Sequence, residues 1–270
     1  MKRNKIRIFV IRYYKIFTIL LSGLILSGML VYQTILVKPE YIVVRVKGSP
    51  GNWWWVTPRP PDWLAFSIQK GDKEYNSLNQ PVAEVLSVDV YDAGGSTRDA
   101  YLTVRLSVRH NKRTNQYRYK GEPVEIGGPI SMSLDNAFFP GMVIAIYSDN
   151  KREKTYTEKT VRIRKREQWP YEYDSIIIGE TIVDGDGIVI AEILDKQRMP
   201  AEKEAANVNG QLVRTLSPIK DDFYLTVKLK MRKQGDEYIY REEQYIKVGS
   251  NIWLLFPRYN ISGADILSIE

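Results

Sequence analysis

The sequence predicts a mainly β protein, in which one N-terminal transmembrane helix is followed by two tandem, repeated, small antiparallel β-barrel or sandwich domains. Three observations predict this fold. A run of 22 residues near the N-terminus carries no charge, and the chain beyond it repeats itself. Strands in both copies alternate apolar and polar residues with a period of two, which is the pattern of a half-buried β-strand.

The N-terminal region has the pattern of a membrane anchor. Residues 1–15 hold six of the 39 basic side chains and no acidic one, which leaves 33 basic and 32 acidic residues for the rest of the chain. Residues 16–37, from Ile16 to Val37, would span about 33 Å as a helix, enough for a hydrocarbon core of about 30 Å. The run is too long for a signal peptide and ends without a small-residue cleavage site.

The charge asymmetry around this run predicts its orientation. Basic residues collect on the side of the membrane that faces the cytoplasm. We therefore expect a cytoplasmic tail over residues 1–15, a single pass through the cell membrane, and extracytoplasmic domains after it. Because the excess charge lies beside an apolar run, it predicts the lipid bilayer as a partner and does not predict nucleic acid.

Two small residues in the predicted span are candidates for helix packing. Gly23 and Ser27 are four residues apart, a spacing that lets two helices approach closely and would support a homo-oligomer. The alternative is that both residues simply face lipid.

The exported part contains an internal repeat. Gly71-Asp72 followed by Val82-Ala83-Glu84-Val85-Leu86 matches Gly179-Glu180 followed by Ile190-Ala191-Glu192-Ile193-Leu194. Further on, Tyr101 to Leu106 matches Tyr224 to Leu229, and the second copy has about 15 extra residues in between. We expect repeat one over residues 41–147, a charged linker over 148–157, and repeat two over 158–270 with an insertion at 197–218. A short helix is expected inside the insertion, from Ala201 to Val208.

Both copies show strand and hairpin patterns. Leu102, Val104, Leu106 and Val108 alternate with polar residues, as do the apolar residues between Phe223 and Met231. Turn sequences at 111–115 and at 234–236 predict hairpins that join each alternating strand to an aromatic-rich one.

The residue inventory argues against an enzyme. There is no cysteine, and His110 is the only histidine, at a predicted hairpin turn. No phosphate-binding, dinucleotide-binding or nucleophile-elbow motif is present. Glu84 and Glu192 lie at equivalent positions in the two copies, where alternation predicts a solvated structural role. We therefore predict no catalytic residue, no cofactor and no metal site.

The aromatic stretch after the first predicted strand is the main candidate for binding. It is followed by a proline-rich segment, which would stiffen an exposed loop. Exposed indoles could stack on sugar rings or enter a partner's pocket, they could contact lipid headgroups, or they could close one end of the β domain as part of its core. The candidate residues are Trp53, Trp54, Trp55 and Trp63.

The chain resembles a family of bacterial single-pass membrane proteins of unknown function. The resemblance is carried by the basic tail, the hydrophobic span, the segment VVRVKG, and the pattern around Gly71-Asp72, Asn79-Gln80-Pro81 and Val82 to Val85. It implies membrane attachment and an extracytoplasmic β domain, and it implies no activity. We expect a non-enzymatic interaction or scaffold protein of the cell envelope, with an unidentified envelope protein as partner. The alternative is a membrane-tethered glycan- or cell-wall-binding module that uses the tryptophans.

Overall fold

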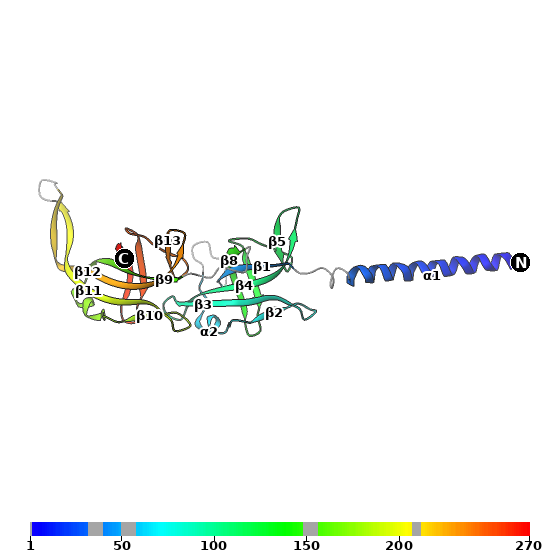
Figure 1. The fold of residues 1–270 in the computed structure, drawn as a ribbon, viewed down its shortest axis with the longest axis horizontal. Coiled ribbons are helices and arrows are strands. Elements are labelled where there is room, and N and C mark those ends of the chain that lie inside the picture. The colour runs from blue at the N-terminus through cyan, green and yellow to red at the C-terminus, as the bar shows by residue number, and fades with distance from the viewer. Residues whose placement is uncertain (1, 32–39, 50–57, 148–155, 207–211) are drawn as a thin grey trace.

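A computed structural model of the chain describes residues 2–31, 40–49, 58–147, 156–206 and 212–270 (Figure 1). The protein is mainly β, as predicted, and each repeat is one curled antiparallel sheet that forms a half-barrel. The elements of the N-terminal part and repeat one are α1 (Lys2–Val31), β1 (Glu40–Gly48), α2 (Asp62–Ala65), β2 (Lys73–Tyr75), β3 (Pro81–Asp92), β4 (Arg98–Asn111), β5 (Gln116–Tyr119), β6 (Glu122–Val124), β7 (Pro129–Ser133) and β8 (Phe138–Tyr147). Those of repeat two are β9 (Tyr156–Gln168), η2 (Pro170–Ser175), β10 (Thr181–Val183), β11 (Val189–Ala206), β12 (Leu212–Gln234), β13 (Glu237–Tyr240), β14 (Gln244–Ile246), β15 (Asn251–Leu255) and β16 (Asn260–Ile269).

The two repeats share one topology. The strand order is β2-β3-β4-β1-β8-β7 in repeat one and β10-β11-β12-β9-β16-β15 in repeat two. In each sheet a two-stranded hairpin branches from the long fourth strand, β5–β6 from β4 and β13–β14 from β12. These two hairpins begin at the turns that the sequence predicts.

The period of two determines which face of each sheet forms the core. The four apolar residues of the alternating run in β4 are all buried, and so are those of β12. Each half-barrel packs its own apolar cluster, and Tyr91 and Tyr101 of repeat one pack into the cluster of repeat two.

Helix α1 contains residues 2–15 of the predicted tail and most of the predicted membrane segment. Within the part of the chain that the structure describes, no helix is both long and apolar enough to cross a membrane. The single transmembrane span therefore stays a prediction.

The insertion differs from the prediction. Ala201 to Ala206 belong to strand β11, so the short helix expected there is wrong over these residues. They pair with β12, for example Glu202 with Leu216 and Lys203 with Thr215, and the paired strands project from repeat two as a hairpin (Figure 1). Cross-strand pairing outweighs the helix propensity of the Ala, Glu and Lys residues there.

A buried arginine joins the two repeats. Arg45 in β1 is 1% exposed. Its guanidinium donates to the carboxylates of Asp89 in β3, at 2.5 Å, and Glu242 after β13, at 2.9 Å, and to the hydroxyl of Thr103 at 2.8 Å. Burial alone would lower the pKa of Arg45, but Glu242 and Asp89 outweigh it and raise that pKa.

Further contacts surround this ion pair. Lys47 Nζ lies 2.6 Å from Glu243. The amide of Gly185, in the turn that carries Asp184 and Asp186, donates to the carbonyl of Val90 at 2.7 Å. A Cβ at Gly185 would lie 2.8 Å from the Val90 Cβ, so only glycine allows this approach. The two repeats are therefore in direct contact through charged, apolar and main-chain groups.

Replacing Arg45 with Leu should destabilise the full chain by about 3 kcal/mol, because the buried Glu242 carboxylate loses its nearest cation. Arg162, at the equivalent position of repeat two, is exposed and provides the matched control. Arg162→Leu should change the free energy of unfolding by less than about 0.5 kcal/mol. Denaturant unfolding followed by circular dichroism measures both, and equal effects would contradict a special role for Arg45.

Candidate functional site

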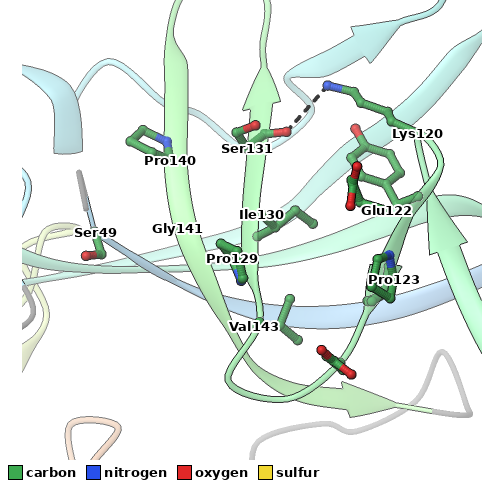
Figure 2. Close-up of a pocket in the computed structure, with 14 residues that line it drawn as sticks. Ser49, Lys120, Glu122, Pro123, Pro129, Ile130, Ser131, Pro140, Gly141 and Val143 are labelled. Carbon is green, nitrogen blue, oxygen red and sulfur yellow. Dashed lines mark hydrogen bonds between the residues drawn. The ribbon is translucent and has the colours of Figure 1, made fainter. Parts of the chain in front are cut away.

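A groove opens in repeat one between the β5–β6 hairpin and strands β7 and β8. Its cavity volume is about 410 Å³, which lies within the range of ligand-binding pockets. Figure 2 shows Lys120, Glu122 and Pro123 on one side and Pro129, Ile130 and Ser131 on the other. The groove is lined by Ser49, Tyr119, Lys120, Glu122, Pro123, Val124, Glu125, Gly128, Pro129, Ile130, Ser131, Pro140, Gly141 and Val143.

Two strand edges border this groove. Among the described strands, β7 pairs only with β8 and β6 only with β5, so each has one side without a partner strand there. An unpaired edge exposes main-chain N–H and C=O groups that can pair with another extended chain. The groove therefore combines an apolar cavity with the unpaired edges of two strands.

The close approach of β8 to β1 shapes one wall. Gly141 in β8 lies opposite Gly48 in β1. A Cβ at Gly141 would lie 2.5 Å from Val46 Cγ1 and 2.7 Å from the Lys47 carbonyl oxygen. Because such contacts are too short for any side chain, glycine is required at this point of the wall.

A buried carboxylate supports the hairpin side of the groove. Glu74 in β2 is 4% exposed and accepts hydrogen bonds from the Tyr119 hydroxyl and from Lys120 Nζ. Burial, followed by the hydrogen bond to Glu74, raises the pKa of Tyr119. The equivalent tyrosine of repeat two, Tyr240, is fully buried, and its hydroxyl has no hydrogen-bond partner among the residues that the structure describes. Ile182 takes the place of Glu74 there, so this polar support belongs to repeat one.

The two tyrosines should respond differently to loss of the hydroxyl. Tyr119→Phe should cost about 1–3 kcal/mol, because the buried Glu74 carboxylate loses a donor. Tyr240→Phe is the matched control and should be neutral within about 0.5 kcal/mol, since it removes a hydroxyl that bonds to none of the described residues. Denaturant unfolding of the full chain checks both, and equal losses would show that the bond to Glu74 contributes nothing.

The predicted tryptophan site is described only in part. Trp53, Trp54 and Trp55 lie outside the described residues, whereas Trp63 lies in the short helix α2 and is 73% exposed. Trp63 is therefore not a core residue. Trp169 of repeat two, just before η2, is 41% exposed and has Lys220 Nζ 3.7 Å from its ring centre.

The two predicted helix-packing residues lie in α1. Gly23 has no atom within 4 Å of an added Cβ, and the Ser27 hydroxyl donates to the Leu24 carbonyl at 3.0 Å. Both residues are exposed on the surface of α1 in the single chain.

The residues considered for catalysis or metal binding have structural contacts. His110 stacks on Tyr117 with 4.7 Å between the ring centres, and its Nε2 lies 3.0 Å from Asn115 Oδ1. Glu84 forms an ion pair with Arg105. Within the described part of the chain, no three His, Asp or Glu side chains are close enough together to hold a metal ion.

The groove residues do not stand out in the sequence. The useful signal was the difference between the repeats at matched positions. The cross-strand pairs align Glu122 with Gln244, and the burial patterns of β7 and β15 align Ser131 with Trp253. Sequence matching alone was too weak in this region to reveal these exchanges.

Comparison of this chain with models of known families, with curated proteins and with solved structures finds no match. Evidence about its function therefore comes from its own residues and geometry.

Proposed function

We propose that this chain is a membrane-anchored, extracytoplasmic, non-enzymatic interaction or scaffold protein of the cell envelope. The observation that carries the proposal is the junction between the repeats. Arg45 of repeat one and Glu242 of repeat two are both buried and lie 2.9 Å apart. A scaffold needs such a junction, because surfaces on two domains can engage partners together only when their spacing is maintained.

The anchoring part of the proposal rests on the charge-free run from Ile16 to Val37 behind a basic tail. The non-enzymatic part is supported by the groove, which is lined mainly by proline, glycine and branched apolar residues. The buried carboxylate that supports the hairpin side of the groove, Glu74, already bonds to Tyr119 and Lys120.

Crosslinking in intact cells that express the full chain, followed by purification, should retrieve a reproducible set of envelope proteins. The chain should stay in the membrane fraction after washing at pH 11, and protease added outside the cytoplasmic membrane should degrade residues 40–270. Release by the wash, or protection of these residues from protease, would refute the anchored topology. A purification that retrieves nothing beyond the untagged control would refute the interaction function.

A glycan-binding module is the second candidate function, and the exposure of Trp63 favours it. An exposed indole can stack on a sugar ring. Retention on purified cell-wall polysaccharide should fall at least about tenfold in Trp63→Ala, because one ring stack contributes on the order of 1.4 kcal/mol. Trp169→Ala, which removes a ring partly covered by Lys220, is the control and should retain binding. Equal retention by both variants and the unaltered chain would exclude Trp63 as the binding surface.

A further inference from the structure

The free edge of β7 presents a peptide group to the groove at Ser131. In the β7–β8 ladder Ser131 lies opposite Pro140, whose carbonyl faces away from β7 and accepts from the Ser49 N–H at 3.0 Å, so the two residues form a pair without hydrogen bonds between them. The Ser131 carbonyl instead accepts a hydrogen bond from Lys120 Nζ at 3.4 Å, across the groove (Figure 2). In an antiparallel ladder the N–H and C=O of one residue point to the same side. The N–H of Ser131 therefore faces the groove as well.

Repeat two places an amide at the equivalent edge position. Gln244 corresponds to Glu122, and Trp253 in β15 corresponds to Ser131. In the orientation that satisfies both partners, the Gln244 side chain accepts from the Trp253 N–H at 2.7 Å and donates to the Trp253 carbonyl at 3.3 Å. A side-chain amide has the same donor and acceptor as a peptide group. This edge position in repeat two thus binds a peptide-like group.

Repeat one lacks this internal amide. Glu122 ends in a carboxylate, which accepts hydrogen bonds but cannot donate to a carbonyl. Among the described residues no side chain bonds to both the N–H and the C=O of Ser131. The cavity of about 410 Å³ adjoins this edge.

We propose that the groove of repeat one binds an extended peptide segment of a partner protein, which adds as a strand to the β7 edge at Ser131. The peptide's main chain supplies the donor and acceptor that Gln244 supplies in repeat two. This peptide site rests on the proposed interaction function and specifies the chemistry of its partner.

The lining of the groove indicates the side chains of this peptide. Val124, Ile130 and Val143 form an apolar wall that suits a small branched side chain. At the rim, Glu122 and Glu125 are exposed and form no ion pair with the described residues, whereas Lys120 is paired with Glu74. The groove therefore favours an extended segment in which a Val or Ile residue is close to a Lys or Arg.

The test uses the full chain in detergent and an array of octapeptides that alternate Val or Ile with Thr or Lys. The best peptide is then labelled, and its dissociation constant is measured by fluorescence anisotropy. The double variant Glu122→Gln with Ser131→Trp reproduces the capped edge of repeat two and should weaken binding at least about tenfold. Gln244→Ala changes only repeat two and should leave binding to repeat one unchanged. Near-ultraviolet circular dichroism verifies that each variant is folded.

A second measurement isolates the main-chain contact. Methylating the peptide nitrogen that faces β7 removes one hydrogen-bond donor and keeps the sequence, so scanning single N-methyl groups along the peptide should reveal alternate positions that weaken binding at least about tenfold. Exchanging Lys for Glu in the peptide should also weaken binding, and this effect should shrink at high salt.

Several outcomes would overturn the peptide site. They are an array without any binder, equal binding by the capped variant, or N-methylation without effect at every position. Binding that appears only after Trp53, Trp54 and Trp55 are replaced with Ala would mean that the chain itself occupies the groove, which also excludes the partner. If the capped variant still retrieves the same envelope proteins in the crosslinking experiment, the interaction function stands and this site for it fails.

Discussion

The buried guanidinium of Arg45 is the interaction on which the arrangement of the two repeats depends. Arg45 projects from the outer face of β1, opposite the core residues Val44 and Val46, and would be solvated in an isolated half-barrel. Taking it out of water is favourable only because carboxylates from both repeats, Asp89 and Glu242, meet it there. This contact favours one docking geometry, since a shift of the repeats would separate Arg45 from Glu242 and leave it with the Asp89 carboxylate of its own repeat.

The two half-barrels share the same strand pairing but carry different side chains at equivalent positions. At equivalent positions of the two sheets, repeat one has Glu74 where repeat two has Ile182, and Ser131 where repeat two has Trp253. The exchanges act together, because Glu74 binds the Lys120 ammonium that in turn reaches the Ser131 carbonyl. In repeat two the corresponding edge is closed by an amide of its own. The same strand order therefore supports a closed edge in one copy and an open groove in the other.

How much of this structure the sequence predicts depends on whether an interaction is local or joins residues that are far apart in the chain. The alternation of apolar and polar residues along β4 and β12 predicts their buried faces, because successive side chains of a strand point to opposite faces of the sheet. The helix expected from Ala201 to Val208 is wrong over Ala201 to Ala206, because residues 202–206 pair with residues 212–216 of the neighbouring strand β12, and local propensity does not register that pairing. Alternation puts Arg45 on the outer face of β1, but it cannot reveal that repeat two covers this face. The groove escapes prediction for the same reason, since its walls come from strands that are neighbours only in the folded sheet.

An open sheet edge also carries a risk, and the groove residues limit it. Exposed strand edges recruit other chains without selectivity unless something interrupts their hydrogen-bonding groups. Pro123 lies within β6 and Pro129 begins β7, and neither has an N–H to offer. Strand β7 is only five residues long, and Ser131 lies at its centre. Main-chain pairing is thereby confined to a short stretch, where it is too weak to hold a chain without the apolar cavity and the acidic rim. Selectivity arises because all three contributions are needed together.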